Sequence, residues 1–184
     1  MLSNGGLAAI SIDPLARALD ATRGSFYWHF SSREDLVGAV LERWETISTE
    51  QVIARMDLIE NPAQRLTSLL NHVLQHREAS DVEISLLASA RDPLVAAVLR
   101  RTTERRIGYV EQLYRELGCS RADAHDRALL AYTAYVGLLE TQWATDQTTL
   151  PPGAARRRYL SFLARTMLPD ISTDQRVARW PRAD

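Results

Sequence analysis

The sequence contains no lysine: all 22 basic residues are arginine, against 23 acidic residues, for a formal net charge of −1. The charge of the whole chain therefore predicts nothing about binding to nucleic acid. A genome rich in G and C accounts for the replacement of lysine by arginine. Net charge therefore predicts no partner for this protein.

Cysteine and long apolar runs are also scarce. Cys119 is the single cysteine, so no disulfide can form within the chain, and a disulfide-stabilised secreted scaffold is excluded. The longest charge-free apolar stretch in the second half, residues 128–139, has twelve residues, too few to cross a bilayer. Residues 1–12 lack the positive flank and the sustained apolar segment of a secretion signal. We expect a soluble, cytoplasmic protein with no membrane partner.

Patterns of β-strands are nearly absent as well. Period-two alternation of branched residues is rare, whereas apolar residues recur throughout at spacings of three and four. With 184 residues, 46% of them hydrophobic, the chain is long enough to bury a sizeable core. The sequence therefore predicts an all-α fold.

Capping residues mark where these helices begin. We expect starts at or near Ser11, Thr22, Ser31, Asn61, Asp81, Asp92 and Ser120, and a last helix around residues 159–166. Ser31 and Glu34 have the spacing of a capping box that opens a long helix reaching about Arg55. Gly118 stands where a helix should stop, and residues 148–153 are typical of a loop. The polar tail from Pro169 is either loose or docked through Trp180.

Two short helices separated by a turn within the first thirty residues match the spacing of a helix-turn-helix, whose second helix enters the DNA major groove. Such a pair is also common as a simple packing unit. The residues from Thr22 to Leu36 read Thr-Arg-Gly-Ser-Phe-Tyr-Trp-His-Phe-Ser-Ser-Arg-Glu-Asp-Leu, with donors at a helix start followed by aromatics. From Gly5 to Val40 the sequence resembles the TetR family of one-component transcriptional regulators.

This resemblance implies a division of the chain into three parts. Residues 1–45 would form the helix-turn-helix DNA-binding domain, residues 46–168 a helical ligand-binding and dimerisation bundle, and residues 169–184 a polar tail. The family's first helix would precede Met1, so we expect that helix to be largely missing from the given sequence.

The helix after Thr22 supplies groups that suit DNA. Hydroxyl, phenol and imidazole groups can donate hydrogen bonds to phosphate oxygens. Arg23 is expected to reach a base edge or a flanking phosphate, and Gly24 to allow close approach. Trp28 and Phe30 are alternatively core residues of this domain, and Arg33 a solvated helix-start arginine. We predict DNA contact from Thr22, Arg23, Gly24, Ser25, Tyr27, Trp28, His29 and Arg33.

The resemblance also implies a homodimer formed by the last two long helices. The helix after Ser120 carries two apolar stripes, so it can face its own core and a partner at once, although an intramolecular bundle would use both faces too. The predicted interface residues are Ala128, Ala131, Tyr135, Leu138, Gln142, Tyr159, Phe162, Leu163 and Thr166.

Effector pockets in such folds lie between the middle helices, where polar or aromatic residues interrupt apolar stripes. The candidates are Trp44, Met56, His72, His76, Tyr132 and Trp143, each of which is alternatively a plain core or surface residue. His72 and His76 lie one turn apart, but a metal would need a third ligand such as Glu83 or His125. We predict no metal and no cofactor.

Motifs for catalysis are missing from the sequence. It has no nucleophile elbow, no phosphate-binding glycine loop and no cysteine paired with histidine in a motif. We expect a non-enzymatic repressor that binds a near-palindromic operator as a homodimer and is released by a small apolar or aromatic effector. The alternative is a ligand-binding or interaction dimer of the same fold that lacks competent DNA binding, because the first helix of its DNA-binding unit is missing. Residues 1–33 also carry only three arginines against two aspartates, a small positive charge for binding DNA.

Overall fold

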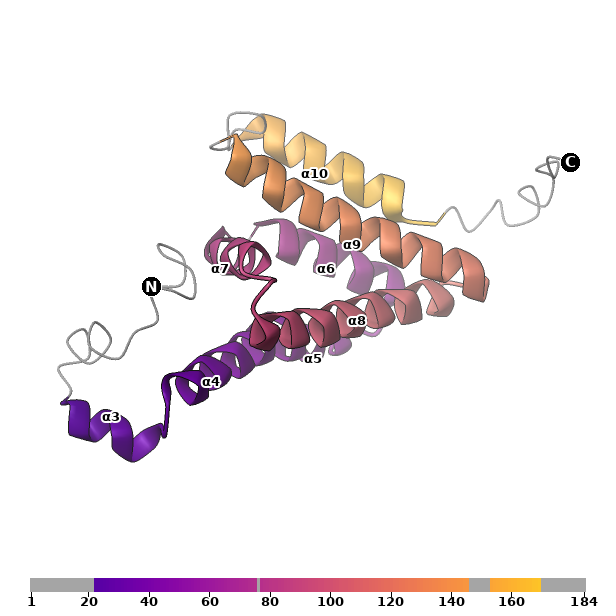
Figure 1. The fold of residues 1–184 in the computed structure, drawn as a ribbon. Helices are drawn as coiled ribbons and strands as arrows, with labels where there is room; N and C mark the ends of the chain where they lie inside the picture. Colours follow the sequence, from indigo (N-terminus) through magenta and orange to yellow (C-terminus); the bar gives the residue numbers. More distant parts are fainter. Residues whose placement is uncertain (1–21, 76, 146–152, 170–184) are drawn as a thin grey trace, which may run out of the picture. The chain divides into compact units, whose positions relative to one another are not determined.

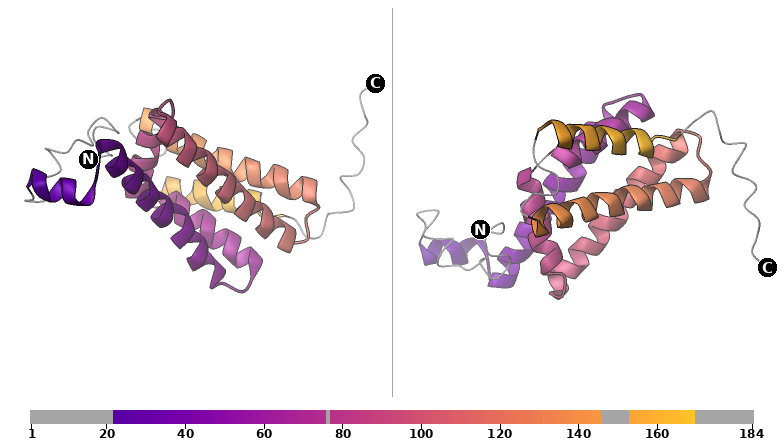
Figure 2. Two further views of the ribbon diagram at one scale, coloured as in Figure 1. Left: turned by 60° about the horizontal axis from the view of Figure 1, so that its bottom comes forward. Right: turned by 90° about the horizontal axis from the view of Figure 1, so that it is seen from above.

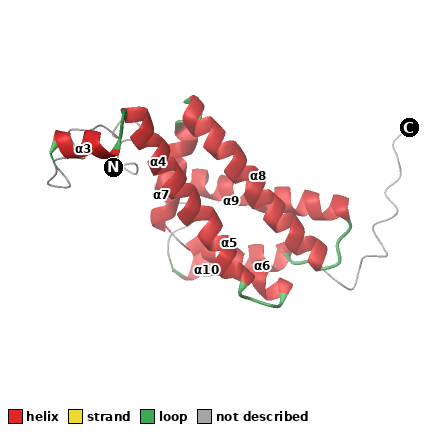
Figure 3. Cartoon of the chain, turned by 90° about the horizontal axis from the view of Figure 1, so that it is seen from below, coloured by secondary structure: helices red, strands yellow, loops and turns green. Residues whose placement is uncertain are grey.

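The computed structural model describes residues 22–75, 77–145 and 153–169, and the chain is helical with no strand in these ranges (Figures 1 and 3). The predicted all-α fold is thereby confirmed. None of the helices described is long and apolar enough to cross a membrane. In order they are α3 (Arg23–His29), α4 (Arg33–Glu45), η2 (Thr46–Glu50), α5 (Gln51–Asp57), α6 (Pro62–Gln75), α7 (Arg77–Ala88), α8 (Pro93–Glu116), α9 (Arg121–Ala144) and α10 (Ala154–Met167).

Four of the predicted helix starts are confirmed by side-chain caps, in which an oxygen accepts an otherwise unpaired backbone N–H of the first turn. The acceptors are Thr22 Oγ1 (3.1 Å from Ser25 N), Asn61 Oδ1 (3.1 Å from Gln64 N), Asp92 Oδ1 (2.9 Å from Leu94 N) and Ser120 Oγ (3.2 Å from Asp123 N). Local sequence therefore fixes these starts.

The end of α8 is set by Gly118, as predicted. Gly118 has φ +92°, a left-handed conformation that glycine adopts without steric cost. Its N–H bonds to the Arg115 carbonyl at 3.0 Å, and the Cys119 N–H bonds to the Tyr114 carbonyl at 3.1 Å. These two bonds form a Schellman motif, which satisfies carbonyls that the helix itself leaves unpaired.

The start of the long helix after α3 differs from prediction by one residue. Ser32, not Ser31, is the N-cap of α4, because its Oγ accepts the Asp35 N–H at 3.0 Å. Asp35 in turn accepts the Ser31 N–H at 3.0 Å, so Asp35, not Glu34, is the reciprocal partner. Either register satisfied the sequence pattern, and a serine followed three residues later by an acid occurs in both.

The long helix also contains a turn that the sequence did not predict. The segments α4, η2 and α5 follow one another without a break from Arg33 to Asp57, close to the predicted span. η2 is π-helical: the Gln51 N–H bonds to the Thr46 carbonyl, five residues back. In addition, the Thr46 hydroxyl donates a hydrogen bond to the Glu42 carbonyl at 2.9 Å, and bonds of this kind often bend helices.

The remaining helices lie close to their predicted positions, although α7 begins at Arg77, before the predicted start at Asp81. That start was placed where the apolar pattern begins, and the helix extends through the polar residues before it. The helix expected after Ser11, most of the expected loop at 148–153 and the tail with Trp180 lie outside the described residues.

The described chain forms two compact units, each considered by itself. The first unit comprises residues 22–54 and 77–105, and the second comprises residues 55–75, 106–145 and 153–169. The buried core of the first unit is Leu36, Val37, Leu41, Trp44, Leu86, Val95 and Val98. In the second unit the buried apolar residues include Leu66, Leu69, Leu70, Tyr109, Leu113, Tyr114, Ala124, Ala128, Leu139, Leu160, Ala164 and Met167. The predicted division at residues 45 and 168 follows function and stays a prediction.

Candidate DNA-binding site

The short helix α3 is carried by the first unit. Phe30, directly after α3, is partly buried against the core that α4, α7 and α8 share. The alternative interpretation of Phe30 as a core residue is therefore confirmed. α3 leads into α4 through the turn at Ser31 and Ser32, where the Ser31 N–H bonds to the Asp35 carboxylate and the Asp35 N–H bonds to Ser32 Oγ. The ribbon in Figure 2 shows α3 followed directly by α4.

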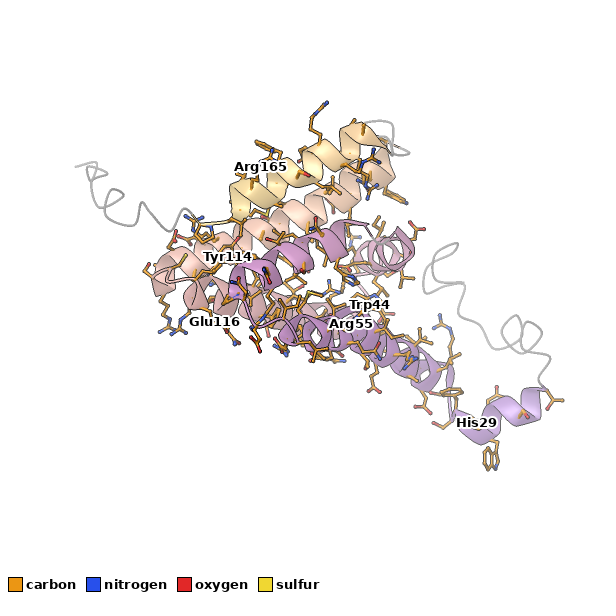
Figure 4. All side chains as sticks on the ribbon, turned by 180° about the vertical axis from the view of Figure 1, so that it is seen from behind. His29, Trp44, Arg55, Tyr114, Glu116 and Arg165 are labelled. Atoms are coloured by element: carbon orange, nitrogen blue, oxygen red, sulfur yellow. The ribbon has the colours of Figure 1, made fainter. Side chains whose placement is uncertain are left out.

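Side chains of α3 are exposed rather than packed. Trp28 is 83% exposed and Tyr27 is 56% exposed, so Trp28 is not the core residue that the sequence left open. The Trp28 and His29 rings meet edge to face, with centroids 4.8 Å apart and an interplanar angle of 88°. His29 is visible on α3 in Figure 4. The other predicted contact residues with described side chains, Thr22, Gly24, Ser25 and Arg33, are exposed as well, while the side chain of Arg23 lies outside the described atoms.

These groups can hold DNA in two complementary ways. Hydroxyl, phenol and imidazole groups can donate to phosphate oxygens, and phosphate contacts fix the register of a protein on the duplex. An apolar ring can contact the methyl group of thymine in the major groove. A Cβ added at Gly24 would lie 3.7 Å from Thr22 Oγ1, an ordinary contact, so packing among the described residues does not require a glycine there.

Within the first unit, two ion pairs join the continuous helix formed by α4, η2 and α5 to α8. Arg101 Nε lies 2.8 Å and 2.9 Å from the two carboxylate oxygens of Glu45, and Arg105 Nε lies 3.2 Å from Glu50 Oε1. The hydrogen bond to Glu45 raises the pKa of Arg101. Sequence reasoning missed these four residues. The sequence feature that could have indicated them is a pair of arginines four residues apart on one helix and a pair of glutamates five residues apart on another.

The predicted pocket residues divide between the two units. Trp44 is buried in the first unit, and Met56 is buried in the second. His72 and Tyr132 are half-buried in the second unit, Trp143 is 67% exposed, and His76 lies outside the described residues. The pocket therefore stays a prediction.

In the described parts of the chain, no group of three or more histidine, cysteine or acidic residues is arranged so that it could hold a metal ion. His125 Nδ1 instead lies 3.1 Å from Glu111 Oε2, and Glu83 is buried in α7.

The predicted interface residues are partly buried within the single chain. Ala128, Ala131 and Gln142 of α9 are buried, whereas Tyr159, Phe162 and Thr166 of α10 are exposed. Tyr135, Leu138 and Leu163 are half-buried. Leu129 and Leu130 on α9 are exposed apolar residues outside the predicted interface set. The predicted interface therefore stays a prediction.

Comparisons with known proteins agree with this arrangement. A family model described as "Bacterial regulatory proteins, tetR family" matches residues 1–40. The HTH-type transcriptional regulator CymR of Pseudomonas putida is 28% identical, with 88% of this chain and 87% of that protein aligned. The HTH-type transcriptional regulator AcrR of Shigella flexneri is 30% identical over 41% of this chain and 35% of its own length.

Solved structures share the fold. The reduced form of NemR from E. coli superimposes with a TM-score of 0.69 at 16% identity, covering 88% of this chain and 89% of that one. AibR, solved in complex with isovaleryl coenzyme A and operator DNA, has a TM-score of 0.63 at 18% identity, covering 90% of each chain. At these identities the likeness concerns the fold alone.

Proposed function

The chain belongs to the tetR family of bacterial regulatory proteins and is a transcriptional regulator, and from this premise we propose that it is a repressor that binds a near-palindromic operator as a homodimer. In the proposed complex, α3 of each protomer enters one of two successive major grooves, roughly 34–36 Å apart. The tail from Pro169 has no part in the proposal.

The exposure of α3 is the observation that carries the proposal. Tyr27 and Trp28 are 56% and 83% exposed, although a helix of a globular protein normally turns its aromatic residues inward. Exposed aromatic rings among hydrogen-bond donors are a combination that a groove of DNA can cover. Thr22, Arg23, Gly24, Ser25, His29 and Arg33 complete the proposed contact set.

Homodimerisation is supported by the surface of the second unit. Leu130 and Trp143 of α9 are 59% and 67% exposed, and Phe162 of α10 is 53% exposed. The Tyr159 and Phe162 rings stack with centroids 6.5 Å apart, so they present one aromatic surface. Large apolar side chains exposed together commonly mark a protein interface, and a two-fold axis pairs the same surface of both copies.

Release by an effector is the third part of the proposal. The likeness to AibR, solved in complex with isovaleryl coenzyme A and operator DNA, supports an effector site, because a chain of this fold there binds a small molecule as well as DNA. We propose an apolar or aromatic small molecule that binds among the middle helices and tilts the helix beginning at Arg33. The binding free energy would then favour one placement of α3 over another. A fall in operator binding on addition of a panel of small aromatic compounds would test this part.

Binding of the purified protein to its own promoter DNA tests the core of the proposal. Fluorescence anisotropy across a salt series should give tight binding that weakens steeply with salt, because phosphate contacts release counterions. Tyr27→Ala should weaken operator binding by roughly 10-fold or more, the loss of one good contact at the interface.

Leu58→Ala is the matched control, since Leu58 is a large exposed side chain, 83% accessible, outside α3. It should leave operator binding unchanged. A folded dimer that binds promoter DNA no better than unrelated DNA would favour the alternative, a ligand-binding or interaction dimer without competent DNA binding. Equal affinities of wild type and Tyr27→Ala would overturn the assignment of α3.

A further inference from the structure

The π-helical turn η2 brings together two glutamates that a regular helix would separate. Glu45 and Glu50 are five residues apart, and in an α-helix residues five apart point about 140° away from each other around the axis. In a π-helix the backbone bond spans five residues, so residues five apart lie one above the other. The bond from the Gln51 N–H to the Thr46 carbonyl places such a turn between them.

The partners of these glutamates have the spacing of an ordinary helix. Arg101 and Arg105 lie four residues apart on α8, and neighbours at that spacing share one face of an α-helix. The Arg101 guanidinium is bonded to both carboxylate oxygens of Glu45, and Arg105 Nη2 lies 3.3 Å from Glu50 Oε2. The five-residue spacing of the acids thus matches the four-residue spacing of the bases only because of the π turn.

Polar residues between the two pairs are buried, which makes the contact specific. Thr49 of η2 and Thr102 of α8 are each only 1% exposed, and Thr102 Oγ1 lies 3.5 Å from Glu45 Oε1. A shift of one helix past the other would therefore move buried hydroxyls as well as break both ion pairs. Buried polar groups that lose their partners destabilise a structure, so the pairing favours a single register.

We propose that Glu45 and Glu50 are positioning residues for operator recognition, which hold the long helix to α8 in one register and thereby set how α3 is presented to DNA. This inference rests on the proposed function, because it concerns the same helix α3. The two glutamates and α3 belong to the first unit. α3 is joined to α4 by the capped turn at Ser31 and Ser32. Rotation of α4 about its axis would therefore turn α3 with it.

The test replaces both acids with their neutral isosteres, Glu45→Gln and Glu50→Gln, in one full-length variant. We expect the ratio of operator affinity to unrelated-DNA affinity to fall by roughly 3- to 30-fold, the range for mutations that act on a site through other residues. Hydrogen–deuterium exchange of the amides in residues 46–51 should become faster, because helix opening there is no longer opposed by the pairs. Circular dichroism should show the same helix content.

Two further variants separate positioning from charge and from folding. Glu104→Gln removes one exposed acid from α8 itself and should leave the affinity ratio unchanged. The exchanged pair Glu45→Arg with Arg101→Glu should recover at least part of the ratio relative to Glu45→Arg alone, which a general loss of stability would not produce. This comparison also decides the matter if the double glutamine variant fails to fold.

Wild-type binding distinguishes this inference from the proposed function. If the wild type prefers its operator and the double glutamine variant keeps the same ratio, the positioning role is wrong while the proposed function stands. If exchange at 46–51 quickens without any change of ratio, the ion pairs stabilise the turn but do not position α3. A wild type without operator preference would overturn both.

Discussion

At the scale of single residues, the hydroxyl of Tyr114 links the C-terminal ends of two helices of the second unit, α8 and α10. It is 1% exposed, and its hydroxyl donates to the Met167 carbonyl at 2.8 Å, linking the last turns of α8 and α10 (Figure 4). That carbonyl is in the last turn of α10, where the helix itself supplies no partner. Burial raises the pKa of Tyr114 to about 12, so the hydroxyl keeps its proton and remains a donor at neutral pH.

Tyr114→Phe should therefore lower the free energy of unfolding by about 1–2 kcal/mol, because a buried carbonyl loses its donor while the ring packing is retained. Urea denaturation at a fixed protein concentration measures this. Tyr159→Phe removes the same hydroxyl from a ring that is 39% accessible in the single chain and keeps the ring for the proposed dimer interface, so it should change stability by less than about 0.5 kcal/mol. Equal effects of the two substitutions would show that the bond to Met167 contributes nothing.

At the scale of elements, the end of α8 is determined by residues next to it in the sequence. Pro93–Glu116 is a 24-residue helix shared by both units, and its last turn closes at Gly118 through the two bonds from Gly118 and Cys119. Only a residue that tolerates φ near +90° can occupy this position without strain, which is why a glycine stands there. The same helix carries a second glycine, Gly108, whose backbone is ordinarily helical.

The two glycines of this region should respond in opposite directions to alanine. Gly118→Ala should destabilise the protein by about 1–2 kcal/mol, the cost of a left-handed conformation with a Cβ atom. Gly108→Ala should stabilise it by up to about 1 kcal/mol, since a Cβ there meets nothing within 4 Å and alanine favours helix. Thermal unfolding of the two variants side by side gives the comparison, and a loss of stability at both positions would contradict it.

For the whole molecule, the two units expose different kinds of surface. The first unit exposes aromatic and polar groups on α3, and the second exposes large apolar groups on α9 and α10. Among the described residues of a single chain, both surfaces are exposed. A homodimer on DNA would cover both at once, and two copies would double a sparse set of phosphate contacts, which suits a protein with a net charge of −1.

Phe162→Arg should dissociate the proposed dimer, because an arginine would have to leave water for an apolar interface. We expect the dissociation constant of the dimer to rise by at least roughly 30-fold, as for the loss of a central interface residue. Sedimentation equilibrium measures the change, and operator affinity should fall in parallel. Leu58→Arg places the same charge at an 83% exposed residue outside α9 and α10 and should leave the mass unchanged. A Phe162→Arg variant that remains dimeric would place the interface elsewhere.

The sequence by itself determined the features that depend on a few neighbouring residues. Caps at Thr22 and Ser120 and the stop at Gly118 each involve bonds within about five residues, so their side chains and backbone carry the whole signal. The run from Thr22 to Leu36 likewise identified the family before any packing was known. The one-residue shift from Ser31 to Ser32 marks the limit of this reasoning, since both registers offered a serine and an acid.

Only the tertiary structure decided the features that depend on which helices meet. The chemistry of Trp28 suits either a core or a surface position. Its exposure depends on how α3 packs, which the local sequence does not specify. The ion pairs of Glu45 and Glu50 join residues 56 and 55 positions apart, and the π turn that aligns them has no signature in local propensity. Side-chain chemistry specifies a helix over a few residues, whereas its register against another helix is set by distant partners.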